Sequence, residues 1–398
     1  MNRLAADTLL KKTLLRSSIV LVVYSAIAHN APPQYSKWFA LLVFFAAMLA
    51  LLRSLLRFQL ARLTPPPESN DRLALIDTVA GLLAYPGEMH RFYARRRLLF
   101  SRMSARHQHL VSGTGYAKRL AELGRLADRN GELATRIAKL AEKQYNITRG
   151  ELLYSRHPVA NARVVELLKH FVRDWSDEGK RERDVLFPPI IDAIKQEFGV
   201  RSNKRVLVPG AGVGRLAYEI SLLGCETEAN EFSQLMHLGN LFALEQIAES
   251  CTVYPFIHNL SHQTTGTQQF RAVRFPDTTP ADKDHSGLEV RYGDFLQLKT
   301  RYDAIATLFF IDTAENVLDY IDTIKRLLVP GGIWVNYGPL KWGTAPKAEM
   351  TAEEMELLLP KMGFTIEKRW SGQAEYVADS ESMWRGFYGL EGWIARKS

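Results

Sequence analysis

Glycines and an acid that could hold a nucleoside lie close together in the middle of the chain. The run Arg205–Pro209 is rich in β-branched residues and leads into Gly210-Ala-Gly-Val-Gly214, and Glu231 follows at the end of a second strand-like run. Glycines let a turn approach a ligand closely, because a Cβ would collide with it. A carboxylate at a strand end can accept hydrogen bonds from two ribose hydroxyls. The pattern predicts a nucleotide-binding strand–helix–strand unit.

The spacing of the glycines distinguishes two classes of cofactor. The fingerprint of dinucleotide binding is GxGxxG. Its third glycine would stand at position 215, which is Arg215, so the sequence reads GxGxG instead. We therefore expect a nucleoside without a pyrophosphate.

Acidic residues also follow two later strand-like runs. Leu288–Gly293 ends in Asp294-Phe295, an acid and a ring that suit the edge and the face of an adenine. The apolar run Tyr302–Phe310 ends in Ile311-Asp312-Thr313, and Pro330-Gly-Gly332 turns into a further strand. This series predicts an α/β fold, the Rossmann-like sheet of class I S-adenosylmethionine-dependent methyltransferases, rather than a nicotinamide oxidoreductase.

Longer motifs between about residue 150 and the C-terminus carry a resemblance to one family. They are Phe171–Ser176, Val208–Leu216, Asn230–Ser233, Ile257-His258, Phe275–Asp277, Gly293–Phe295, Phe309–Ala314, Pro330–Trp334 and Gly338–Leu340. Through them the chain resembles the carnosine N-methyltransferases, which implies methyl transfer from S-adenosyl-L-methionine to an imidazole or amine nitrogen of a small molecule.

The resemblance also implies which residues bind the cofactor. Arg173 matches an arginine that reaches the methionine carboxylate, a group that suits a guanidinium fork. Glu231 would hold the ribose. The full cofactor set implied is His170, Arg173, Gly210, Gly212, Glu231, Asp294 and Phe295. A plain helical ion pair between Arg173 and Asp177 stays open as an alternative.

On the acceptor side the resemblance implies Asp312, Tyr388 and His258. Asp312 would hold the N–H of the acceptor while its other nitrogen attacks the methyl group, so that orientation supplies much of the rate and no metal is required. Tyr388 would contact the substrate, and His258 lies in an insertion, 251–290, that could roof the site. A packing role for Tyr388 and a structural role for His258 stay open.

Two positions depart from the family on the acceptor side. Gly343 stands where the family has a histidine, and Gly386 at the apparent position of a second tyrosine. We therefore expect a wider pocket and an acceptor bulkier than carnosine. A methyltransferase acting on a lipid amine or other small amine, and a non-catalytic cofactor-binding scaffold, remain alternatives.

The N-terminal segment 1–63 predicts a transmembrane hairpin. Ile19–Ala28 and Trp38–Leu52 are apolar runs separated by Pro32-Pro33, and basic residues flank their outer ends. With flanks, 17–57 could enter a membrane and leave both chain ends in the cytoplasm. The expected domains are the hairpin at 1–63, a linker at 64–71, a helical domain at 72–198 and the methyltransferase domain at 199–398.

Charge and cysteine content restrict the remaining classes. Residues 1–63 contain eight basic residues and one acid, so they carry +7 of the net charge of +8. The body of the chain is therefore nearly neutral, which disfavours a nucleic-acid partner. Two cysteines in 398 residues, without metal-type spacing, indicate neither a disulfide scaffold nor a metal site.

Overall fold

The computed structural model describes residues 45–46, 48–49, 52–53, 69–200, 202–246, 250–280, 285–343, 345–376 and 379–398. They belong to two compact units, 1–80 with 141–158, and 81–140 with 159–398. The second unit joins helices before residue 198 to the sheet after it, so the expected boundary between a helical and a methyltransferase domain stays a prediction.

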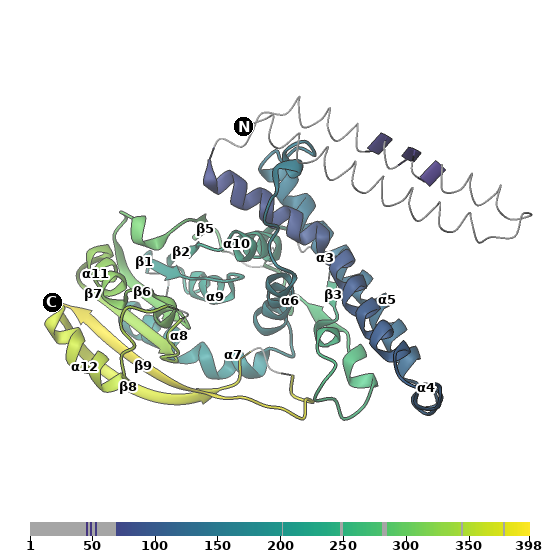
Figure 1. The fold of residues 1–398 in the computed structure, drawn as a ribbon. Helices are drawn as coiled ribbons and strands as arrows, with labels where there is room; N and C mark the ends of the chain where they lie inside the picture. The colour runs from purple at the N-terminus through teal and green to yellow at the C-terminus, as the bar shows by residue number, and fades with distance from the viewer. Residues whose placement is uncertain are drawn as a thin grey trace, which may run out of the picture. The chain divides into compact units, whose positions relative to one another are not determined.

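Helices fill the described chain up to residue 198, and strands alternate with helices after it (Figure 1). The helices are α3 (Asn70–Ser101), α4 (Ala105–Ser112), α5 (Tyr116–Gln144), α6 (Asn161–Trp175), α7 (Lys180–Leu186), α8 (Pro188–Phe198), α9 (Arg215–Ser221), α10 (Gln234–Leu241), α11 (Val317–Leu327) and α12 (Ala352–Lys361). The strands are β1 (Arg205–Pro209), β2 (Glu226–Glu231), β3 (Cys251–Val253), β4 (Val273–Phe275), β5 (Leu288–Tyr292), β6 (Tyr302–Leu308), β7 (Leu328–Gly338), β8 (Phe364–Ala374) and β9 (Tyr388–Lys397).

The predicted integral membrane location is wrong on the described residues. None of the helices they form is long and apolar enough to cross a bilayer. The physical reason lies in the lengths of the apolar runs, because Ile19–Ala28 and Trp38–Leu52 both fall short of the roughly 20 residues that a span needs. Nearly all of the expected hairpin, 1–63, lies outside the described residues.

The sheet confirms the predicted Rossmann-like arrangement. Seven described strands follow the order β5-β2-β1-β6-β7-β9-β8. The first five are parallel, and β9 runs antiparallel between β7 and β8. Since β1 has β2 on one side and β6 on the other, the chain reverses direction across the sheet at β1, and a ligand crevice is expected at the carboxyl ends of these strands.

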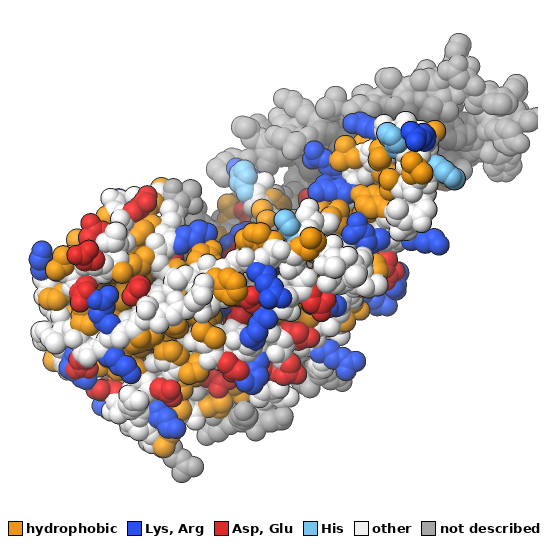
Figure 2. All heavy atoms as spheres, turned by 90° about the horizontal axis from the view of Figure 1, so that it is seen from below, with side chains coloured by type: hydrophobic (Ala, Val, Ile, Leu, Met, Phe, Trp, Pro, Cys, Tyr) orange, Lys and Arg blue, Asp and Glu red, His pale blue; other side chains and the backbone are white. Residues whose placement is uncertain are grey.

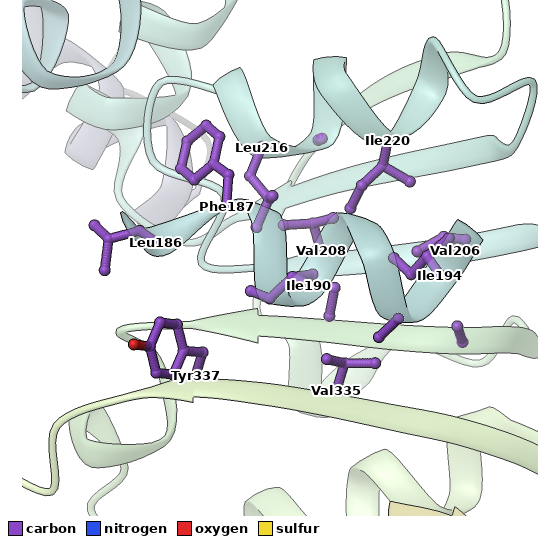
Figure 3. Close-up of a cluster of buried hydrophobic side chains, with 14 of the residues drawn as sticks. Leu186, Phe187, Ile190, Ile194, Val206, Val208, Leu216, Ile220, Val335 and Tyr337 are labelled. Carbon is purple, nitrogen blue, oxygen red and sulfur yellow. The ribbon is translucent and has the colours of Figure 1, made fainter. Parts of the chain in front are cut away.

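Both faces of the sheet are buried, and successive side chains of a strand belong to opposite faces. Val206 and Val208 of β1 pack with Ile190 and Ile194 of α8 in one cluster (Figure 3). Leu207, between them, belongs to a second cluster with α11 and α12. Successive strand residues point to opposite faces, so a buried run such as RVLVP is the pattern of a strand covered by helices on both sides.

Acidic and basic side chains are interspersed over much of the described surface seen in Figure 2. That distribution agrees with the nearly neutral charge of the chain after residue 63.

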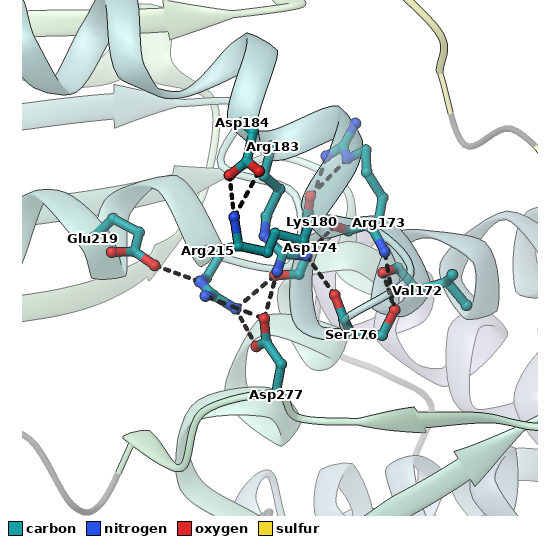
Figure 4. A network of polar contacts seen from close by, with 11 residues as sticks. Val172, Arg173, Asp174, Ser176, Lys180, Arg183, Asp184, Arg215, Glu219 and Asp277 are labelled. Atoms are coloured by element: carbon teal, nitrogen blue, oxygen red, sulfur yellow. Dashed lines mark hydrogen bonds and ion pairs between the residues drawn. The ribbon is translucent and has the colours of Figure 1, made fainter.

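A buried ion cluster joins the end of α6 to the glycine-rich turn (Figure 4). Asp277 accepts hydrogen bonds from Arg183 and, at 2.5 Å, from Nη1 of Arg215, and all three side chains are less than 10% exposed. Nη1 of Arg215 also donates to the carbonyl of Asp174 at 2.9 Å, and Nη1 of Arg183 to that of Ser176 at 2.8 Å. We call Arg183, Arg215 and Asp277 the buried clamp.

The indole of Trp175 completes this connection. Its Nε1 donates to the carbonyl of Val213 at 2.8 Å, while the backbone N–H of Asp277 donates to the carbonyl of Trp175 at 2.7 Å. The segment after α6 is thereby bonded to the glycine-rich turn, to α7 and α9, and to the insertion that carries Asp277.

Asp277→Asn should strongly destabilise the protein, because it leaves the buried guanidinium of Arg183 without a carboxylate and that of Arg215 with Glu219 alone. We expect a loss of about 3–5 kcal/mol in the free energy of unfolding, the range for removing one partner of a buried ion pair. Asp184→Asn is the matched control, since Asp184 pairs with Lys180 at 2.6 Å but both side chains are about 60% exposed. It should cost less than about 1 kcal/mol. Equal losses in urea unfolding would contradict the assignment.

Candidate active site

A cavity of ≈ 550 Å³ opens at the carboxyl ends of β1, β2 and β6, where the sheet topology predicts a ligand. It brings together most of the cofactor residues implied by the sequence. His170, Gly210, Gly212, Glu231, Asp294 and Phe295 all line it. We call it the donor cavity.

The glycine-rich turn forms one side of the donor cavity. Gly210 and Gly212 have φ of +63° and +57°, conformations that L side chains rarely adopt. A Cβ at Gly210 would collide with the ring of Phe310, whereas no described atom lies within 4 Å of the Cβ position at Gly212. Gly212 therefore leaves open space beside the backbone, which fits close approach of a ligand.

Glu231 lies at the end of β2 and is 8% exposed. Its Oε2 accepts the backbone N–H of Gly212 and its Oε1 that of Ser233, both at 2.8 Å. Burial raises the pKa of this carboxyl, against the effect of the backbone N–H groups. Each oxygen retains a second lone pair, so a carboxylate held here can accept two further hydrogen bonds, as the hydroxyls of a ribose require.

Asp294 and Phe295 occupy the far wall of the donor cavity, after β5. Asp294 caps the short 3₁₀ turn Phe295–Gln297 by accepting the backbone N–H of Leu296 at 2.9 Å. The ring of Phe295 is buried and stands edge-on to Phe310, with centroids 5.2 Å apart. An acid and an apolar ring are thus present together, as an adenine site needs.

His170 reaches the same cavity from α6. Burial lowers the pKa of its imidazole, which is therefore neutral at physiological pH. Its Nε2 lies 3.4 Å from Oη of Tyr376, and its buried Nδ1 has no hydrogen-bond partner among the described residues. An unsatisfied buried nitrogen is costly, and a ligand group in the cavity would supply the missing partner.

Arg173 lines a second cavity, of ≈ 610 Å³, and not the donor cavity. Its Nε and Nη2 form a bidentate pair with Asp174 at 2.6 and 2.9 Å, so the alternative pair with Asp177 is not the one the structure has. Burial opposes the charge of Arg173, but Asp174 outweighs it and the pKa is raised. A direct contact of Arg173 with the cofactor stays a prediction, and its guanidinium fork is already occupied.

Tyr388 lines this second cavity together with Tyr376, which the sequence analysis missed. Tyr376 lines both cavities, and its ring lies 6.3 Å from that of Tyr388 and 4.8 Å from that of Phe309. It follows β8 in a stretch without a strand or helix pattern, and only its being a second tyrosine shortly before Tyr388 could have indicated it.

The structure therefore gives no support to a wider acceptor pocket at Gly386. A second tyrosine is present at Tyr376, and a Cβ at Gly386 would lie 2.7 Å from the indole of Trp384, which fills the space beside this glycine. Gly343 keeps open space, since the nearest atom to its Cβ position, the carbonyl oxygen of Asp312, is 3.8 Å away.

Phe309 lines the donor cavity and has a strained backbone. Its φ is +50°, in the left-handed region that a bulky residue rarely adopts. The backbone N–H of Phe309 donates to the carbonyl of Tyr337 at 3.1 Å, which helps to hold this conformation. Strain of this kind is concentrated at functional sites.

Asp312 follows β6 in the 3₁₀ turn Ile311–Thr313 and is 8% exposed. Burial raises the pKa of its carboxyl to about 6, although the charge of nearby Lys341 acts in the opposite direction. Nζ of Lys341 also donates to Oη of Tyr388 at 3.3 Å. Lys341 is thus a common neighbour of the two residues implied on the acceptor side, while Asp312 itself lines neither cavity.

His258 has both ring nitrogens engaged within the protein. Its Nε2 bonds Oη of Tyr85 at 2.7 Å and its Nδ1 the carbonyl of Pro255 at 3.0 Å. Burial lowers its pKa to about 4, and it lines neither cavity. This geometry favours the structural alternative, and contact with a substrate stays a prediction without geometric support.

Comparison with known proteins gives a consistent result. A family model described as Carnosine N-methyltransferase matches residues 153–398. The Carnosine N-methyltransferase of Schizosaccharomyces pombe is 32% identical over 355 residues, which cover 81% of this chain and 95% of that protein. The one of Mus musculus is 39% identical over 246 residues, 58% of this chain and 62% of that protein. The chain thus spans nearly the whole fission yeast relative but less than two thirds of the mouse one.

The matched region contains the sheet, α6 and both cavities, and it includes every motif that suggested the resemblance. With more than half of the chain matched, and 32% identity over nearly the full length of the fission yeast relative, the chain belongs to the carnosine N-methyltransferase family.

Proposed function

We propose that the protein transfers a methyl group from S-adenosylmethionine to an imidazole nitrogen of a small molecule, with carnosine as one acceptor. Family membership supports the reaction and the cofactor. The placement of donor and acceptor rests on one observation: the side chain of Tyr376 lines both cavities and forms a wall between them. A donor on one side of this wall and an acceptor on the other can meet at its edge. Of the two positions that suggested an acceptor bulkier than carnosine, only Gly343 still supports it.

On the donor side, the residues of the protein bind the cofactor and orient it. S-adenosylmethionine, when bound, supplies a methyl group on a positively charged sulfur. Glu231 would hold the ribose hydroxyls, and Asp294 with Phe295 the adenine. Gly212 provides room for the chain of the cofactor beside the turn, and His170 offers a free ring nitrogen. These groups fix the position of the donor, and alignment of this kind supplies a large part of the rate in a displacement reaction.

On the acceptor side, Asp312 would accept the N–H of an imidazole and leave the other ring nitrogen free to attack. Its carboxylate stabilises the positive charge that develops on the ring as the new N–C bond forms. The rings of Tyr376 and Tyr388, held nearly perpendicular at 89°, would confine a planar acceptor.

The second cavity is also the reason to disfavour a lipid amine. Charged side chains line it at Glu166, Lys169, Arg173, Arg181 and Asp379. Burying acyl chains against such groups would remove water from the charges, which is costly even where they are paired.

Glu231→Gln should weaken binding of S-adenosylhomocysteine, the product form of the cofactor. One acceptor oxygen becomes a donor, so hydrogen bonds to a charged group worth about 1.5–3 kcal/mol are lost. Calorimetry should show this as a roughly 10- to 150-fold higher Kd. Glu289→Gln, an exposed position on β5 that is paired with Arg291, serves as the control and should bind normally. Unchanged affinity in Glu231→Gln would contradict the assignment of the donor cavity.

Asp312→Asn should lower kcat while cofactor affinity stays nearly constant. It keeps the shape of the side chain and removes the charge that stabilises the ring, so we expect a loss of about 10²–10³, the scale for one preorganised electrostatic contact. Rates are measured with labelled S-adenosylmethionine and carnosine, and Asp322→Asn, exposed on α11, is the control. Full turnover by Asp312→Asn would remove it from the catalytic machinery.

The same pair of variants tests the raised pKa of Asp312 through stability. A folded-state pKa of about 6, above the unfolded value near 3.9, means that the folded chain binds this proton more tightly. Its stability should therefore fall as pH rises from about 4 to 6, by at most about 3 kcal/mol. Asp312→Asn should lack this loss, so its advantage in urea unfolding should grow over that range and then stay constant. An advantage that does not change with pH would contradict the raised pKa.

A further inference from the structure

One face of α6 supplies charged groups to both cavities. Glu166, Lys169, His170 and Arg173 recur at helical spacing, so they lie on the same side of the helix. His170 lines the donor cavity, whereas Lys169 and Arg173 line the second cavity. Glu166 and Lys169 have no role in the function proposed above; Glu166 already pairs with Arg163, whereas Lys169 is half-buried rather than solvated.

Of the four guanidinium groups that line the second cavity, three have carboxylate partners, whereas the exposed Arg385 donates to the carbonyl of Ser380. Arg173 is paired with Asp174, Arg181 with Glu375, and Arg271 with both Asp379 and Glu381. Their charges are therefore largely compensated inside the protein, and a bound anion would have to compete with carboxylates held in fixed geometry.

The two carboxylates that act on the charge of Lys169 also have other ion-pair partners. Asp379 accepts from Arg271, and Glu166 pairs with Arg163 at 2.5 Å. Both carboxylates act on Lys169 only through space, and among the described residues Lys169 itself forms neither a hydrogen bond nor an ion pair within 4 Å. An ammonium group that is half-buried in a cavity and lacks a direct partner is unfavourable unless a ligand supplies one.

The electrostatic environment of Lys169 agrees with this arrangement. Burial lowers the pKa of its ammonium group, and Asp379 and Glu166 act in the opposite direction. The group therefore loses solvation without gaining a contact, and a negatively charged ligand would restore the stabilisation.

We propose that Lys169 is an anion-binding residue of the second cavity, which pairs with a carboxylate that the acceptor carries outside its imidazole ring. The proposal rests on the function proposed above and narrows it, because it requires an acceptor that carries both an imidazole and a carboxylate. Asp312 and the two tyrosines would orient the ring, and Lys169 would select the acid.

Two probe acceptors separate this proposal from the function on which it rests. Carnosine carries the carboxylate, and its decarboxylated analogue, β-alanylhistamine, has the same imidazole and amide without it. The parent chain should show a kcat/KM for carnosine about 10- to 100-fold above that for the analogue, the scale of one charge-assisted hydrogen bond.

Lys169→Met keeps the aliphatic stem and removes the charge. It should lower kcat/KM for carnosine by the same factor, mainly through KM, and leave kcat/KM for the analogue within about twofold. Affinity for S-adenosylhomocysteine should be unchanged, because Lys169 does not line the donor cavity. Lys180→Met, exposed on α7, is the matched control and should behave as the parent chain with both acceptors.

The outcomes are distinct. Equal use of the two acceptors by the parent chain, or equal loss on both in Lys169→Met, would overturn the carboxylate assignment while methyl transfer itself stands. A loss of S-adenosylhomocysteine affinity in Lys169→Met would place the lysine on the donor instead. Methylation of neither probe by the parent chain would overturn the proposed function, and the inference with it.

Discussion

The carboxylate of Asp277, buried between two guanidinium groups, is the contact on which the geometry of both cavities depends. Arg215 begins α9 directly after the glycine-rich turn, and Arg183 belongs to α7, so one acid from the insertion ties three parts of the unit together. Such a cluster costs desolvation and is stable only when every charge is matched, and Glu219, which accepts from Nε of Arg215 at 2.8 Å, supplies the second carboxylate. The cluster therefore fixes the positions of the three parts relative to one another, since a shift of any one part would break a buried ion pair.

Because the clamp also binds carbonyls at the end of α6, it fixes that helix against the turn that holds the donor. The apolar face of α6, with Leu167 and Phe171, packs inward, and Gly239 of α10 fits beneath Leu167, where a Cβ would lie 2.5 Å away. The polar face is then left to line the cavities. The helix thus supplies side chains to both cavities, and the motif FVRDWS is accounted for more by this positioning than by direct contact with a ligand.

The sequence was informative where function follows from local pattern. Short β-branched runs, the GxGxG turn and acids at strand ends predicted the parallel sheet and five residues of the donor cavity, because parallel strands bring their carboxyl ends to one edge, while His170 came from the family resemblance. It was less informative where chain segments distant in sequence meet. Tyr376 reaches the cavities from a stretch without periodicity, and the partner of Arg173 is its neighbour Asp174, not Asp177 one turn on. The apolar runs 19–28 and 38–52 were over-interpreted as a transmembrane hairpin, since each is shorter than the roughly 20 residues that a span needs.

The acceptor side shows features that oppose stability. Asp312 is buried with its pKa raised, Phe309 holds a left-handed backbone, and Lys169 is half-buried without a direct partner. Each raises the free energy of the folded chain, and the proposed acceptor, which donates an N–H and presents a carboxylate, would offset the first and the last of these. Stabilising such positions by mutation commonly costs activity. The rigid sheet and the buried clamp offset this loss of stability, because they hold these groups in place before a ligand binds. The site is therefore preorganised for its acceptor and does not depend on the acceptor to assemble it.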